Sequence, residues 1–203
     1  MINDQWLLRG KIVLGLLLAA TTYGFFYFEN SLLMQIIVLI FGLSSFLWAI
    51  LYKDDAPPLN SRREILILFI LYLGVYTLYN MLYGLGMPLY LIMIAVWLLV
   101  SLLFLALLIL DRIDTLLNHP LFYVFVSLSG LISLEVFLSL SFWPIDPKVK
   151  SLILVVVFYL MTNLIYLHTH NMLRFKKIIG LIIASFLIIG LLILSIWTSL
   201  KGG

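Results

Sequence analysis

The sequence predicts an all-α integral membrane protein, built as a bundle of seven transmembrane helices. Hydrophobic residues make up 65% of the 203-residue chain and charged residues 10%, whereas soluble domains carry about 25% charged residues. Seven stretches have the roughly 20 apolar residues that a helix needs to cross a bilayer. They are continuously apolar, while strands of a membrane barrel alternate, so helices are favoured. The predicted spans lie at about 12–28, 31–52, 64–84, 88–110, 121–142, 150–169 and 178–199.

The first two spans are both expected to stay in the membrane. Arg9 and Lys11 precede the first span, as basic residues precede a signal peptide, but bulky aromatic residues occupy 25–28, where a small-residue cleavage site would lie. The second span ends near Trp48 and Tyr52, and such aromatic residues are typical of the membrane interface. The loops between spans are too short to fold by themselves, so residues 1–203 are predicted to form one domain.

The third and fourth spans differ in polarity. The third ends at a Gly84-Leu85-Gly86 turn, and the fourth begins at Pro88, where a helix tolerates proline in its first turn. The fourth span is rich in Leu and Ile, like the seventh, and both are predicted to face lipid. The third carries polar side chains on one helical face, which favours packing between helices over a ligand pathway. These side chains are Tyr72, Tyr76, Tyr79, Asn80 and Tyr83.

The fifth and sixth spans contain the other polar positions of interest. The fifth follows Pro120 and carries Glu135, the one acidic residue deep inside a predicted span. Asn163 in the sixth span and Asn80 in the third are expected to form hydrogen bonds between helices. Single glycines at Gly74 and Gly130 are expected to allow close helix packing.

The distribution of basic residues predicts the orientation. Lys and Arg in short loops accumulate on the cytoplasmic side. Seven spans place nine basic residues on the side of the amino terminus and three on the other, so the amino terminus is predicted inside and the carboxyl terminus outside, in a cytoplasmic membrane. The nine are Arg9, Lys11, Lys53, Arg62, Arg63, Arg112, Arg174, Lys176 and Lys177, and the three are Lys148, Lys150 and Lys201.

Glu135 is the centre of the candidate binding site. An ionised carboxylate in hydrocarbon costs several kcal/mol, so Glu135 is expected to face the bundle, meet a partner or take up a proton. Polar residues at a similar depth would line a cavity with it. The alternative is a structural carboxyl that is bonded to hydroxyl groups of neighbouring helices. The predicted cluster comprises Glu135, Ser139, Thr22, Tyr76, Asn80 and Tyr159.

The histidines offer only a weak metal site. His119, His168 and His170 fall on the predicted cytoplasmic side, with Asp111 and Asp114 in the same region. His168 and His170 are two residues apart, and on a helix that separates them by about 200°. Interfacial histidines are therefore favoured over a metal centre. The chain has no cysteine, which excludes thiolate chemistry, and no cofactor is indicated.

Three functions remain open from the sequence. The first is a non-enzymatic membrane-embedded subunit, scaffold or assembly factor with a membrane-protein partner or as a homo-oligomer, because recognised catalytic motifs are missing. The second is a small carrier or channel for protons or a small solute, using Glu135. The third is a lipid-modifying enzyme at the cytoplasmic face, using the histidines. The lipid bilayer is the expected environment, and the basic residues flank the spans in a way that does not indicate nucleic-acid binding.

Overall fold

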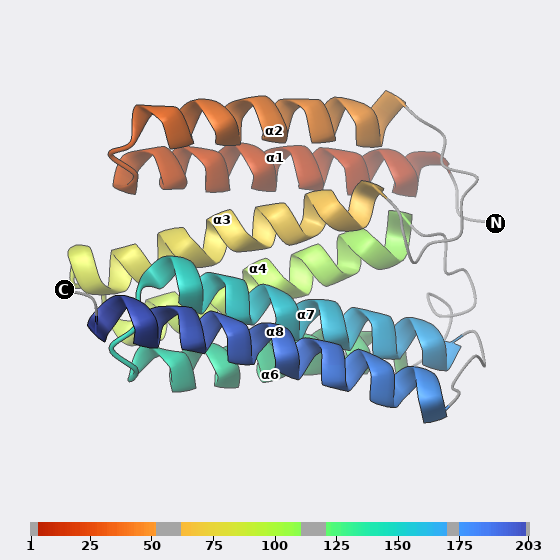
Figure 1. Cartoon of the computed structure of the whole chain (residues 1–203). Helices are drawn as coiled ribbons and strands as arrows, with labels where there is room; N and C mark the ends of the chain where they lie inside the picture. The colour runs from red at the N-terminus through yellow and green to blue at the C-terminus, as the bar shows by residue number, and fades with distance from the viewer. Residues whose placement is uncertain (1–3, 52–61, 111–120, 170–174, 202–203) are drawn as a thin grey trace.

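The computed structural model describes residues 4–51, 62–110, 121–169 and 175–201, which form helices joined by short turns at 29–31, 85–88 and 142–146 (Figure 1). The helices run roughly along one direction, with the two ends of the chain at opposite ends of the bundle. Helix α3 ends at Gly84, as the glycine-rich turn predicts, and Gly86 takes a left-handed backbone conformation with φ of 62°. The helices are α1 (Asp4–Phe28), α2 (Leu32–Leu51), α3 (Arg62–Gly84), α4 (Leu89–Leu110), α6 (Leu121–Ser141), α7 (Pro147–Thr169) and α8 (Phe175–Lys201).

Five of these helices are long and apolar enough to cross a membrane, so the chain is a helical multi-span membrane protein. In the described parts of α2 and α8, the apolar stretches are shorter and cover Leu32–Leu47 and Ile178–Leu192. The predicted helical membrane fold is therefore confirmed, while a count of seven crossings stays a prediction. The five candidate spans are Gly10–Phe28, Glu64–Gly84, Leu89–Ile109, Tyr123–Ser141 and Pro147–His168.

Helices α3 and α4 form the centre of the bundle. Helix α3 packs against α1, α2, α4 and α7, and α4 packs against α1, α3 and α6. Leu103 and Phe104 of α4 are fully buried, and so are Leu66 and Ile70 of α3. The prediction that the 88–110 span faces lipid is wrong. A Leu-rich sequence serves equally well in lipid and in a protein core, because both surroundings are apolar.

Close helix contacts form at both predicted glycines. A Cβ atom on Gly74 of α3 would lie 2.6 Å from Cδ2 of Leu99, and one on Gly130 of α6 would lie 2.6 Å from Oγ of Ser101. Both distances are shorter than real Cβ contacts, so the missing side chain lets α3 and α6 approach α4. The expectation of packing glycines is confirmed at both positions.

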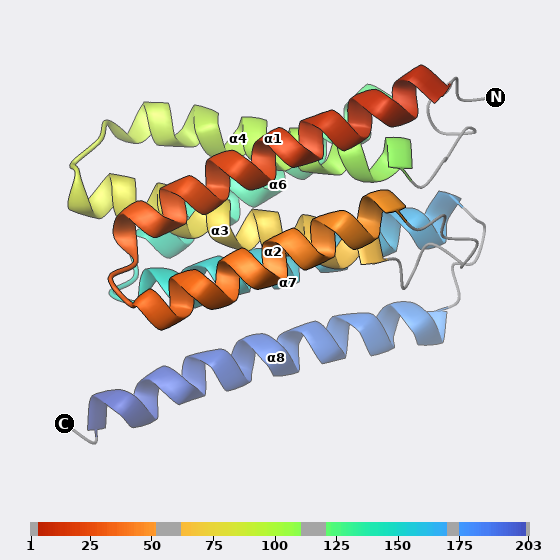
Figure 2. The ribbon, with the colours of Figure 1, turned by 90° about the horizontal axis from the view of Figure 1, so that it is seen from above.

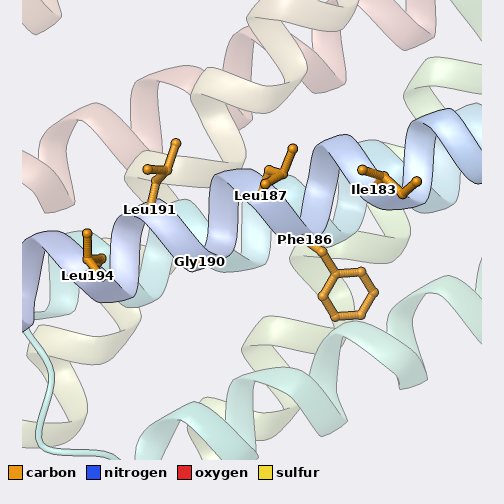
Figure 3. Close-up of a pocket in the computed structure, with 6 residues that line it drawn as sticks. All are labelled: Ile183, Phe186, Leu187, Gly190, Leu191 and Leu194. Atoms are coloured by element: carbon orange, nitrogen blue, oxygen red, sulfur yellow. The ribbon is translucent and has the colours of Figure 1, made fainter.

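Helix α8 lies at the edge of the bundle and packs mainly on α7 (Figure 2). Many of its described side chains point away from the other helices, and Phe186 is 70% exposed. These exposed apolar side chains are consistent with the predicted lipid-facing seventh span, and their contact with lipid stays a prediction. A shallow apolar depression runs along the helix, with Phe186 pointing to the opposite side from Leu187 and Leu191 (Figure 3). Its lining residues are Ile183, Phe186, Leu187, Gly190, Leu191 and Leu194.

Candidate functional site

Glu135 faces away from the bundle. Helix α6 packs on α4 and α7, and its residues Ser129, Ser133 and Phe137 are buried. Glu135 lies two residues from both Ser133 and Phe137, which turns it about 200° from each around the helix, and its side chain is exposed. The surface that it occupies, called here the α6 outer face, otherwise consists mainly of apolar side chains. Its members are Val124, Leu128, Leu131, Glu135, Ser139 and Phe142, which are all exposed.

Glu135 lies within Tyr123–Ser141, one of the helical segments long and apolar enough to cross a membrane. It is six residues from Ser141, the end of the candidate span, which places it about 9 Å from that end along the helix axis. Ser139 lies one turn away, but its hydroxyl donates to the backbone oxygen of Glu135 at 2.8 Å. Within the described ranges, no hydrogen bond or ion pair engages the Glu135 side chain.

The other members of the predicted cluster do not gather around Glu135. Tyr159 is exposed on α7, and Thr22 is half-buried on α1. Asn80 donates to the backbone oxygen of Tyr76 at 2.8 Å, one turn away on α3, which brings these two residues together. This bond lies within α3, so the interhelical hydrogen bond expected of Asn80 is not found among the described residues. Tyr76 itself is buried and directed towards a different carboxylate. The sequence does indicate the direction of the Glu135 side chain, because the small residues of α6 mark the packing face of this helix and Glu135 lies on the other side of it.

That different carboxylate is Glu29, which sequence reasoning did not single out. It follows α1 directly and is only 7% exposed. Lys148, in the first turn of α7, forms an ion pair with Glu29 Oε2 at 2.9 Å, and the Tyr76 hydroxyl donates to the same oxygen at 3.3 Å. Gln35 of α2 donates to the Glu29 backbone oxygen. These contacts, called here the Glu29 cluster, join α1, α2, α3 and α7 at one end of the bundle.

The electrostatics of this cluster favour the ionised carboxylate. Burial alone would raise the pKa of Glu29. The hydrogen bond from Lys148, the N–H of Ser31 and the positive charge of Lys148 outweigh burial, so the pKa lies below its ordinary value. The Glu29 cluster thus holds a charge pair at the end of the bundle, where a pair costs less than in the hydrocarbon centre.

Lys150 lies beside this cluster and is 2% exposed. Its ammonium donates to the Tyr83 hydroxyl at 2.9 Å and lies 4.5 Å from the centre of the Tyr83 ring and 5.3 Å from that of Tyr79. Tyr83 in turn donates to the backbone oxygen of Ser141. A cation over aromatic faces is stabilised by the ring quadrupole. Tyr79 and Tyr83 of the predicted tyrosine stripe therefore pack against α6 and α7 at this end of the bundle, whereas Tyr72 and Tyr76 pack with residues of α1 and α2.

A second polar contact lies near the opposite end of α3. Asn163 of α7 is buried, and its side-chain amide donates to Glu64 Oε1 at 3.3 Å and to the backbone oxygen of Tyr159 at 2.8 Å. The expectation that Asn163 forms an interhelical hydrogen bond is confirmed. Its Oδ1 has no hydrogen-bond partner among the described residues. Glu64 lies at the start of a candidate span and is partly buried, which the sequence does not indicate.

Residues 31–195, from the turn before α2 to the later turns of α8, match the family described as a protein of unknown function, DUF5656. The chain belongs to the DUF5656 family. In this DUF5656 protein, Glu29 precedes the matched range, whereas Glu135, Lys148 and Lys150 lie inside it. Neither a curated protein nor a solved structure matches the chain significantly.

The histidines of this DUF5656 protein lie partly outside the described residues. His119 and His170 belong to that undescribed part, as do Asp111 and Asp114. His168 is exposed near the end of α7, and its ring packs edge-on against Phe125 at 6.4 Å. Across the described ranges, no three His, Cys, Asp or Glu residues are placed to hold a metal ion. The structure therefore adds no support for the predicted histidine site.

Proposed function

We propose that this protein is a membrane-embedded subunit or scaffold that associates with another membrane protein through the α6 outer face. One observation carries the proposal. Glu135 is an acidic residue within a membrane-crossing helix, and its side chain is exposed on an otherwise largely apolar face. A charged side chain exposed to lipid costs about 2.5–3.5 kcal/mol at the centre of a spanning helix and less towards its ends, and Glu135 lies about 9 Å from the end of its candidate span. A protein partner that covers Glu135 and bonds to it removes most of that cost.

The alternative functions have less support. A carrier that uses Glu135 needs this carboxylate to line a passage between the helices, yet the side chain is exposed on the outer face of α6. An enzyme that uses the histidines needs several of them to converge, and the one that the structure describes, His168, contacts an aromatic ring. A subunit or scaffold requires only a persistent bundle with an uncovered polar position, which is what these residues provide.

A site-specific photo-crosslinking experiment in intact membranes tests this function. A photoreactive amino acid at Leu131, one turn from Glu135, is expected to form a discrete protein adduct. The same amino acid at Ile40 of α2, 61% exposed on a different helix, is the control and is expected to label lipid. Glu135→Leu is expected to reduce the adduct at Leu131. Equal, lipid-only labelling at both positions would contradict the proposal.

We also infer that all seven helices cross a cytoplasmic membrane with the amino terminus inside. The roughly parallel arrangement of the helices (Figure 1) and the nine-to-three distribution of basic residues support this topology. The chain has no cysteine, so single cysteines can be introduced as labels. Leu85→Cys, in the turn between α3 and α4, is expected to react with a membrane-impermeant maleimide in intact cells. Reaction only after permeabilisation would show that the turn lies inside and that the orientation is the opposite of the one proposed.

A further inference from the structure

We propose that the segment covering the α6 outer face is a membrane-spanning helix of a different protein, and that this helix carries one Lys or Arg at the depth of Glu135. This inference rests on the proposed function, because it names the chemistry of the partner at the same face. Three steps support it: the unmet bonding capacity of Glu135, the inability of a second copy to meet it, and the shape of the face.

The first step concerns the neighbours of Glu135. Ser139 is the other polar member of the α6 outer face, and its hydroxyl proton is already donated to a backbone oxygen. The remaining members are apolar and donate no hydrogen bonds. A carboxylate accepts about four hydrogen bonds, so a partner must bring the donors. Lys and Arg bring both donors and the opposite charge, and either one is itself costly in lipid until it is paired.

The second step excludes a second copy of this chain as the natural occupant. A two-fold symmetric dimer brings equivalent surfaces together, so contact centred on Glu135 would bring two carboxylates close to each other. The described basic residues nearest this depth are Lys148 and Lys150, near the start of α7. Lys148 is paired with Glu29, and Lys150 is buried against Tyr83. A second copy would have to break one of these contacts to supply a cation.

The third step concerns packing. Leu128 and Leu131 lie seven and four residues before Glu135 on α6, and Val124 lies eleven residues before it. These spacings place the three side chains on the same side of α6 as Glu135, in the pattern by which one helix packs lengthwise against another. A single crossing helix would therefore cover both the apolar stripe and the carboxylate. The charge pair then fixes its vertical register.

The experiment measures association of the full chain with defined helices in phosphatidylcholine vesicles. A fluorescent donor on Leu85→Cys and an acceptor on synthetic Leu/Ala helices report binding by energy transfer. One helix carries a single Lys at the depth of Glu135, one carries Leu there, and one carries Lys at the opposite depth. The depth-matched Lys helix is expected to bind about tenfold or more tightly than the other two.

Variants of the chain separate the charge pair from general packing. Glu135→Gln is expected to abolish the preference for the Lys helix, and Glu135→Lys is expected to transfer it to a helix with Glu at that depth. Ser139→Ala, on the same face, is the matched control and is expected to keep the preference. Equal binding of the Lys and Leu helices, or a preference that survives Glu135→Gln, would overturn the inference.

Two results distinguish the proposed subunit function from the charge pairing. If crosslinking at Leu131 captures a native partner whose spanning helices lack Lys and Arg, the subunit function holds and the charge pairing is refuted. If Leu131 labels only lipid while the Lys helix binds in vesicles, the pairing chemistry is supported and the subunit function fails.

Discussion

Replacing Tyr83 by Phe removes one hydroxyl from the contact with Lys150 and leaves the ring in place. The ammonium of Lys150 loses its hydrogen bond of 2.9 Å but keeps the aromatic face 4.5 Å away. A hydrogen bond to a charged group contributes about 1.5–3 kcal/mol. Tyr83 is 49% exposed, which favours the lower end of that range. We expect Tyr83→Phe to lower the free energy of unfolding by about 1.5 kcal/mol.

Unfolding by sodium dodecyl sulfate in mixed micelles measures this change, and a double-mutant cycle shows how much of it comes from the contact with Lys150. Tyr90→Phe is the matched control, because Tyr90 is 63% exposed, and it is expected to change stability by less than about 0.5 kcal/mol. In a Lys150→Met background, Tyr83→Phe is expected to have a smaller effect, because the only hydrogen bond then lost is the one from the Tyr83 hydroxyl to the Ser141 backbone oxygen. A full effect in that background, or an effect no larger than that of Tyr90→Phe, would refute the reasoning.

Three further predictions use the same unfolding assay. Glu29→Gln should lower stability by about 1 kcal/mol at pH 7. Because the pKa of Glu29 is lowered from 4.5, its carboxylate contributes fully to the free energy of unfolding above pH 4.5. This contribution is lost as the pH falls through the lowered pKa, whereas Glu29→Gln should show no such loss. Gly130→Leu should lower the free energy of unfolding by about 1–3 kcal/mol through overpacking against α4. Gly180→Leu, where a Cβ would have nothing within 4 Å, is the control and should not lower it, and equal effects would contradict the close contact at Gly130. Ser133→Ala should raise stability by about 1 kcal/mol, because the fully buried Ser133 hydroxyl has no partner among the described residues, and a loss would reveal one.

The helices and their packing glycines could be predicted from the sequence because both depend on local features. Apolar length defines a spanning helix, and a glycine in an apolar helix marks a close approach, as Gly74 and Gly130 do. The burial of each helix could not be predicted. In a soluble protein, polar residues mark the outer face, but in lipid the outer face is as apolar as the core. For that reason the sequence predicts that the helix at 88–110 faces lipid, although α4 lies in the centre of the bundle.

The polar contacts were harder to predict because they join distant parts of the chain. Glu29 and Lys148 are each ordinary loop-proximal charges in the sequence, and only the packing of both α1 and α7 against α3 brings them to 2.9 Å. Counting residues from the membrane surface predicts the depth of Glu135, but it does not predict the direction of the side chain around the helix. The small residues Ser129, Gly130 and Ser133 carried the directional information.

The peripheral position of α8 has a consequence for biogenesis. Helix α8 packs mainly on α7, and the central helices α3 and α4 find their principal neighbours among the helices made before it. Synthesis proceeds from the amino terminus, so the core can close while α8 is still in the ribosome. The arrival of α8 then adds a peripheral layer to helices that have already packed together. A ribosome paused within α8 would therefore hold an assembled core in the membrane.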